Sequence, residues 1–158
     1  MEHRETAADA DLAWLDAHYA AMPPVAAMQP GAARLQGDWL LLPAPLSANV
    51  NDKGCAFGGS LVSLMTLAGW GLATLHLRRA GLKADVFVAD TQVRYRAPLY
   101  GDLLARARAV EGQDWAAFVQ ALRSTGRASV RIDARIALPG GGDAARAESR
   151  YVAVASSG

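Results

Sequence analysis

The sequence predicts an α+β fold in which a curved antiparallel sheet wraps around one long helix. Residues 54–77 contain no Asp, Glu, Lys or Arg, so a helix there would be apolar on all sides and must be enclosed. Strand patterns then follow one another along the chain instead of alternating with helices, which favours an antiparallel sheet. The sequence also lacks the G-x-G-x-x-G motif of a dinucleotide-binding Rossmann fold.

The N-terminal part of the chain predicts a helix followed by a strand. Apolar side chains recur at helical spacing in residues 9–21, and Pro23 ends this pattern. A first strand is expected next, at about residues 33–42. Pro43 is expected to break that strand.

The long helix is expected at about residues 60–79. A membrane-spanning helix is the alternative interpretation, because the uncharged stretch is long enough to cross a bilayer. Thr66, Thr74 and His76 interrupt the apolar run, and no other segment resembles a span. We therefore expect the buried core helix of a soluble protein without membrane association.

The remaining strands are expected at residues 86–96, 103–110, 127–136 and 148–155. The pattern at residues 127–136 alternates polar with apolar side chains, which is typical of a strand with one wet and one buried face. Residues 115–122 fit both a helix and a strand.

Composition narrows the functional classes. With 158 residues, of which 52% are hydrophobic and 20% charged, the chain is long and apolar enough to bury a core, and we expect one domain over residues 1–158. The formal net charge of +1 gives no general attraction to nucleic acid, so no nucleic-acid partner is expected.

The single cysteine, Cys55, fits a reducing compartment, and the N-terminus lacks a signal peptide pattern, so a cytoplasmic location is expected. The three histidines lack metal-ligand spacing, so no metal site is expected.

The most informative segment precedes the long helix. Residues 49–60 read Asn-Val-Asn-Asp-Lys-Gly-Cys-Ala-Phe-Gly-Gly-Ser. Glycines let backbone N–H groups approach a ligand closely, and the first turn of a helix presents unpaired N–H groups and the positive end of the helix dipole. Such a place can stabilise an oxyanion. A glycine-rich start of a helix, with the Asn side chains serving turns, is an equally weighted alternative.

These residues resemble a known family. The pattern N-x-N-x-K-G-x-A-F-G-G-S-L leading into L-A-G-W-G, together with A-D-T-Q-V-R-Y-R-A-P at residues 89–98, resembles the YiiD C-terminal, or putative thioesterase, family over about residues 10–155. The resemblance implies a hotdog fold, with the sheet wrapped around the helix at residues 60–79. It also implies a homodimer or dimer of dimers with sites at the subunit interface, and substrates that are acyl thioesters of coenzyme A or acyl carrier protein.

The resemblance implies decarboxylation more readily than hydrolysis. Other hotdog thioesterases carry H-G-G at this loop and an Asp or Glu in the helix, whereas this chain has Phe57 at the histidine position and Thr66 near the position of the acid. The family resemblance includes decarboxylation of malonyl-acyl carrier protein, or malonyl-coenzyme A, to the acetyl thioester. That reaction needs no base and no nucleophile. It needs donors at the developing enolate oxygen, each worth ~3 kcal/mol.

Residue roles follow from this interpretation. We expect the Asn51 amide and the N–H groups of Gly59 and Ser60 to form the oxyanion hole, while Asn49 more readily braces the loop. Asp52 or Asp90 would be the general base of a thioesterase, which is the alternative enzyme; a non-catalytic domain that binds acyl thioesters is the other alternative. No cofactor is expected beyond the pantetheine arm of the substrate. The residues expected to bind substrate are Phe57, Gly58 and Thr66 near the thioester, and Arg78 and Arg79 for coenzyme A phosphates or an acidic carrier protein.

Overall fold

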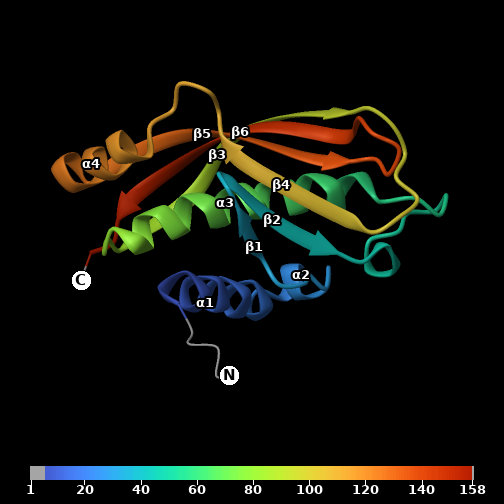
Figure 1. The fold of residues 1–158 in the computed structure, drawn as a ribbon, viewed down its shortest axis with the longest axis horizontal. Helices are drawn as coiled ribbons and strands as arrows, with labels where there is room; N and C mark the ends of the chain where they lie inside the picture. Colours follow the sequence, from blue (N-terminus) through green and yellow to red (C-terminus); the bar gives the residue numbers. More distant parts are fainter. Residues whose placement is uncertain (1–5, 158) are drawn as a thin grey trace.

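A six-stranded antiparallel sheet curves around the long helix α3 in the computed structural model, which describes residues 6–157 (Figure 1). The strand order is β1-β2-β4-β5-β6-β3, and every neighbouring pair is antiparallel. The predicted α+β class, with a sheet wrapped around a helix, is confirmed. The strands are β1 (Arg34–Gln36), β2 (Trp39–Ala44), β3 (Ala84–Tyr95), β4 (Leu103–Ala109), β5 (Arg127–Ala137) and β6 (Asp143–Ala155).

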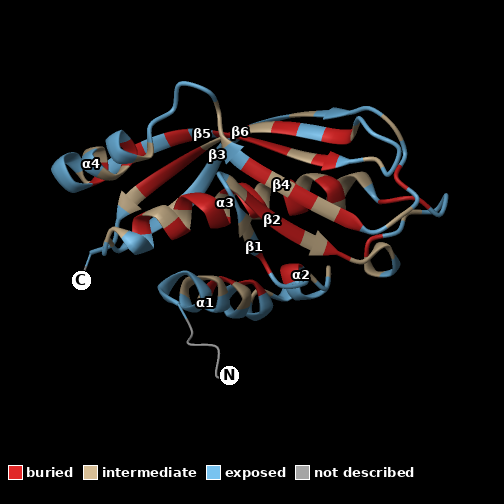
Figure 2. Cartoon of the chain, viewed as in Figure 1, coloured by how far each residue is buried: buried red, intermediate tan, exposed pale blue. Residues whose placement is uncertain are grey.

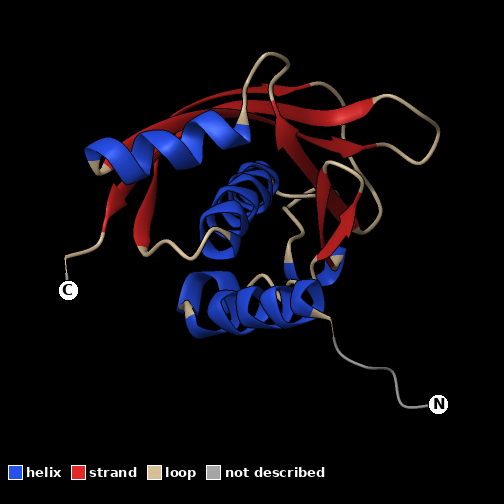
Figure 3. Cartoon of the chain, turned by 60° about the vertical axis from the view of Figure 1, so that its left-hand side comes forward, coloured by secondary structure: helices blue, strands red, loops and turns tan. Residues whose placement is uncertain are grey.

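The helices all lie on the inner, concave side of the sheet, and its outer face is left uncovered (Figure 3). Side chains alternate accordingly: in β5 the inward residues are buried, while most outward ones are exposed (Figure 2). This confirms the strand with one wet face that the sequence predicts. The helices are α1 (Ala7–Ala21), α2 (Pro23–Ala26), the 3-10 turn η1 (Leu46–Ala48), α3 (Gly58–Arg79) and α4 (Trp115–Thr125).

Helix α3 is the centre of the core, as predicted. Its buried residues lie on most of its circumference, and two glycines allow tyrosines from other elements to press against it. A Cβ on Gly69 would collide with Tyr151 of β6, and a Cβ on Gly71 would collide with Tyr19 of α1. Within residues 6–157, α3 is the one helix long and apolar enough to cross a membrane, and more than half of that apolar window is buried inside the fold.

Two local predictions need correction. The segment expected as one strand at residues 33–42 is a hairpin of β1 and β2, because Gly37 adopts a positive φ of 57° and reverses the chain. Pro43 does not break the second strand, which continues to Ala44. The Pro43 carbonyl instead accepts a hydrogen bond of 2.9 Å from the N–H of Gly31, outside the sheet.

The ambiguous segment at residues 115–122 is a helix. The Asp114 side chain accepts a hydrogen bond from the N–H of Ala116 at its start, and Gly126 ends it with a φ of 75°. The last strand begins at Asp143, earlier than expected, and pairs with both β5 and β3. Strand β3 lies at the edge of the sheet, and one side of its backbone pairs with no strand of residues 6–157.

Candidate active site

The loop before α3 is folded back on itself by backbone hydrogen bonds. Val50 pairs with Ala56, the Asn51 N–H donates to the Cys55 carbonyl at 2.8 Å, and the Phe57 N–H donates to the Asn49 carbonyl at 2.7 Å. The turn passes through Gly54, whose φ is 82°. The loop is therefore a small hairpin that delivers the chain to the start of α3 at a fixed angle.

Asn49 braces this hairpin against the rest of the fold. Its side chain is only 2% exposed, and its Nδ2 donates to the carbonyls of Met28 at 2.9 Å and Pro45 at 2.8 Å. Both amide hydrogens are thus used on backbone carbonyls. This is the loop-bracing role that the sequence favoured for Asn49 over a catalytic one.

Asn51 is also engaged within the hairpin. Its Oδ1 accepts from the N–H groups of Lys53 at 2.8 Å and Cys55 at 3.1 Å, and its Nδ2 donates to the Cys55 Sγ at 3.2 Å. The carbonyl oxygen of this amide thus holds a turn of the loop, and the expected contact of the amide with substrate stays a prediction. The amide has two hydrogens and sulfur is a weak acceptor, so the donor side keeps capacity for a substrate oxygen.

The start of α3 presents the donors that the sequence predicted. No side chain caps the helix in the described chain, so the first-turn N–H groups of Gly58, Gly59 and Ser60 have no intrahelical acceptor. The helix dipole adds positive potential at the same point. Phe57 is 55% exposed, and its ring covers the helix start: a Cβ on Gly59 would lie 2.5 Å from the Phe57 Cε1.

A cavity of about 300 Å³ adjoins the helix start on the side of Gly58. The Tyr95 hydroxyl donates to the Gly58 carbonyl at 3.2 Å and forms part of its wall. Sequence reasoning did not identify Tyr95, although its place in the D-T-Q-V-R-Y-R motif of an edge strand was a usable signal. Asn51, Gly59 and Ser60 do not line this cavity. The lining residues are Ala56, Gly58, Leu61, Tyr95, Arg96, Ala97, Pro98 and Ala144.

Neither predicted general base faces this cavity. The Asp52 side chain is 82% exposed and pairs with Lys53 at 2.8 Å. Asp90 pairs with Arg150 at 3.0 Å on the outer face of the sheet, because its neighbour Thr91 points inward to the buried Ser149. Among the residues of the described chain that line the cavity, none carries a carboxylate.

Thr66 and the arginines at the far end of α3 lie at different distances from the helix start. Thr66 is two turns along, half-buried, and its carbonyl accepts the Tyr151 hydroxyl at 2.7 Å. Burial raises the pKa of Tyr151, so this hydroxyl stays a donor. Arg78 and Arg79 are at the opposite end, because the 22 residues of α3 span roughly 33 Å. Both pair with Asp11, at 3.0 Å and 3.4 Å, and their expected binding of coenzyme A phosphates or an acidic carrier protein stays a prediction.

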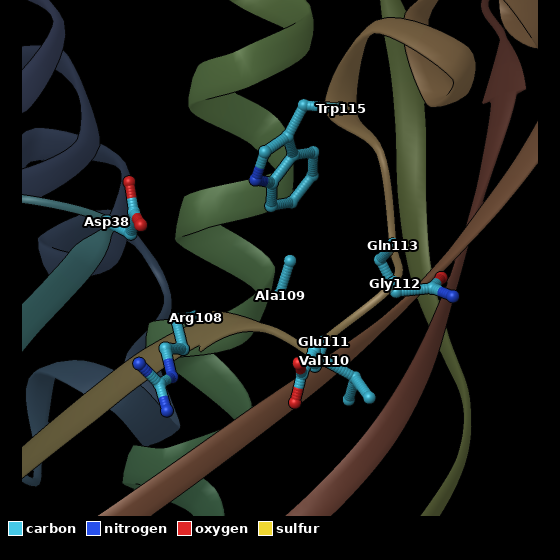
Figure 4. A pocket seen from close by; sticks show the side chains of 8 residues that line it. All are labelled: Asp38, Arg108, Ala109, Val110, Glu111, Gly112, Gln113 and Trp115. Carbon is cyan, nitrogen blue, oxygen red and sulfur yellow. The ribbon is translucent and has the colours of Figure 1, made fainter.

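A larger open hollow of about 430 Å³ lies at the other end of the sheet (Figure 4). Its lining includes Arg108, Glu111 and Trp115. None of the predicted site residues lines this hollow. Behind it, His76 of α3 stacks on Trp115 with ring centroids 3.9 Å apart. Burial, followed by the nearby Arg79, lowers the pKa of His76 to about 4. His76 is therefore a neutral structural ring at pH 7.

The comparisons with known proteins agree with the fold. A family described as putative thioesterase (yiiD C-terminal) matches residues 15–155. A protein of unknown function from Chlorobaculum tepidum TLS is 25% identical with a TM-score of 0.86, over 96% of this chain and 98% of that one. A putative thioesterase from Shewanella oneidensis is 27% identical with a TM-score of 0.82, over 92% and 99%. A probable thioesterase from Pseudomonas aeruginosa shares the fold. It is 18% identical with a TM-score of 0.75, over 98% of this chain and 99% of that one.

Proposed function

Because the chain belongs to the putative thioesterase family of the YiiD C-terminal type, we propose that it is an enzyme acting on acyl thioesters of coenzyme A or acyl carrier protein. The observation that carries this proposal is the uncapped start of α3 beside a cavity, in a loop fixed by Asn49. A cytoplasmic location, where the lone thiol of Cys55 stays reduced, remains part of the proposal.

The chemistry centres on the thioester carbonyl oxygen. Uncapped N–H groups at a helix start bind negative charge that develops on this oxygen better than they bind the neutral carbonyl. One such donor is worth ~3 kcal/mol, or about a hundredfold in rate. The half-buried position of Gly58, Gly59 and Ser60 limits competition from water.

Hydrolysis is the reaction that the family favours. Water would attack the carbonyl carbon, the oxyanion would be held by the first turn of α3, and the thiol would leave. This route needs a base to take the proton from water. Asp52, on the same hairpin, is the acid of this chain that a hydrolase would recruit, because Asp90 lies on the outer face.

Decarboxylation of a malonyl thioester is the second candidate, and one observation favours it. The cavity beside Gly58 is lined by a cation, Arg96, and by no carboxylate of the described chain. In this reaction the bond between the malonyl carboxylate and the α-carbon breaks, carbon dioxide leaves, and the electron pair forms an enolate whose oxygen the helix start stabilises. A proton from water then gives the acetyl thioester. No base and no nucleophile are required, and a nearby carboxylate would repel the substrate.

We also propose that the functional unit is a homodimer formed through β3. This edge strand has 12 residues and exposes Phe87, Val88 and Tyr95, with no proline or lysine to protect its unpaired backbone. Exposed apolar edges of this length invite pairing with another chain. Tyr95 ends β3 at the cavity, so a partner strand would lie next to the site and complete its wall.

The test is to incubate the purified protein with malonyl, acetyl and long-chain acyl thioesters of coenzyme A and of acyl carrier protein. Free thiol is measured with a thiol reagent, and carbon dioxide is measured from a carboxyl-labelled malonyl group. Thiol release identifies a thioesterase, and label release with the thioester retained identifies a decarboxylase. Tight binding without either product would show a non-catalytic binding domain and would contradict the enzymatic proposal. Light scattering after gel filtration measures the dimer.

A further inference from the structure

The outer face of the sheet is rich in arginine and is left open by every helix of the described chain (Figure 3). Outward positions of β4, β5 and β6 alternate with mostly buried inward positions, the outward residues of β3 lie on the same face, and most of the outward charges are positive. The outward arginines are Arg94, Arg106, Arg108, Arg127, Arg131, Arg135, Arg146 and Arg150.

Strand register places four of these arginines in one line across the sheet. Arg94 of β3 is opposite Arg146 of β6, Arg146 is opposite Arg135 of β5, and Arg135 is opposite Arg106 of β4. Directly opposite residues in neighbouring antiparallel strands have Cβ atoms roughly 5 Å apart, where like charges are destabilising. We call these four residues the arginine row.

The arginine row is only partly neutralised. Asp133, 7% exposed, pairs with Arg135 and Arg146 at 3.0 Å each. Arg94 and Arg106 have no carboxylate partner in the described chain. The Arg106 guanidinium lies 4.9 Å from the ring centroid of Trp39, a contact that steadies the side chain without neutralising its charge. The two ends of the row therefore keep free positive charge.

One end of the row lies two residues from the lining of the candidate active site. Arg96 and Ala144 line the cavity beside Gly58, and each is two residues from a member of the row, Arg94 and Arg146. Two residues of a strand span about 7 Å. A large molecule seated on the row would thus reach the cavity with a flexible arm.

We propose that the arginine row docks the acidic surface of an acyl carrier protein, so that its thioester arm enters the cavity beside Gly58. This inference rests on the proposed function and names the substrate carrier. Arginine pairs with carboxylates through two parallel hydrogen bonds, which suits an acidic protein surface. A nucleic acid fits less well, because the formal net charge of +1 gives the chain no general attraction to a polyanion. Arg78 and Arg79 are less suited, because Asp11 already pairs with both.

The experiment measures binding of fluorescently labelled holo-acyl carrier protein by anisotropy at low salt. The double variant Arg94→Gln/Arg106→Gln is compared with Arg127→Gln. Arg127 is a matched control: it is outward on β5 and has no ion pair in the described chain, and eight residues, or roughly 26 Å, separate it from Arg135. We expect the double variant to weaken binding about tenfold, with a smaller effect at high salt, and the control to bind within about twofold of the wild type.

A kinetic comparison extends the test to the substrate. The ratio of kcat/KM for a carrier-borne thioester to kcat/KM for a pantetheine thioester should fall about tenfold in the double variant and stay constant in Arg127→Gln. Binding that is absent in the wild type, unchanged in the double variant or equally weakened in the control would overturn the docking surface, as would row-dependent binding of a DNA duplex. A different result would show that the proposed function is wrong. In that case no thioester would be turned over, whereas the carrier protein would still bind in the anisotropy experiment.

Discussion

The ring of Tyr151 lies so close to Gly69 that no side chain fits between them, and the Tyr151 hydroxyl donates to the Thr66 carbonyl of the same helix. This contact sets the distance between α3 and strand β6, which lies next to the edge strand β3. The first prediction follows from it. Gly69→Ala should lower the free energy of unfolding by about 2 kcal/mol, because overpacking outweighs the roughly 1 kcal/mol that alanine gains in a helix.

Urea denaturation at constant pH measures this change. Gly101→Ala is the control, because Gly101 has open space around its Cα and no positive φ, so its stability should stay within about 0.5 kcal/mol of the wild type. Equal stabilities of the two variants would show that the Tyr151 contact does not set the packing distance.

Asp133 should be the most costly acid to neutralise on the outer face. It is buried between Arg135 and Arg146, and Asp133→Asn would leave both guanidinium groups without their charge partner. We expect a loss of about 2 kcal/mol in the free energy of unfolding. Asp90→Asn is the matched change at an exposed pair with Arg150 and should cost less than about 1 kcal/mol. A larger effect at Asp90, measured by the same urea titration, would contradict this ranking.

His76 makes stability depend on pH in a defined window. Its pKa is about 4 in the folded protein and about 6.5 in an unfolded chain, so the unfolded state binds the extra proton first as pH falls. Its contribution is therefore complete above pH 6.5 and is lost progressively between pH 6.5 and 4. His76→Phe, which keeps a ring against Trp115, should flatten this part of the stability profile. An unchanged slope of unfolding free energy between pH 7.5 and 5 would refute the assignment.

Two substitutions at Asn51 separate its two possible roles. Asn51→Asp keeps the oxygen that accepts from Lys53 and Cys55 but removes the amide donor, whereas Asn51→Ala removes both. If the amide contacts substrate, Asn51→Asp should lower kcat/KM about a hundredfold with little change in Tm. The contrary result is full activity in Asn51→Asp together with lost activity and a lower Tm in Asn51→Ala. It would show that Asn51 only stabilises the loop and does not contact substrate.

The sequence was sufficient for the features that depend on periodicity. The enclosed helix follows from its lack of charge, and β5 follows from strict alternation. The type of secondary structure was harder to predict where it depends on the residues at the ends of a segment. The apolar pattern of α4 fits both a helix and a strand, and Asp114 and Gly126 at its ends favour the helix. The hairpin of β1 and β2 was missed because a single residue, Gly37, reverses the chain within the segment interpreted as one strand.

The sequence predicted which segments lie together at the candidate site better than it predicted their hydrogen bonds. The loop and the start of α3 lie together as expected, but hydrogen-bond partners within a loop depend on how it folds, so the bonds of Asn51 could not be read from residue order. Arg78 and Arg79 looked available because their partner, Asp11, is distant in sequence and sits on another helix. Tyr95 reaches the site only because the sheet curves around α3.

The position of α3 in the chain has a consequence for biosynthesis. Four of the six strands that enclose it are made after it, and the last of them, β6, carries the tyrosine that packs on Gly69. At a synthesis rate of about 5–20 residues per second, this apolar segment stays uncovered for several seconds before the strands that enclose it emerge from the ribosome. Newly made chains should therefore depend on chaperones that bind exposed apolar helices.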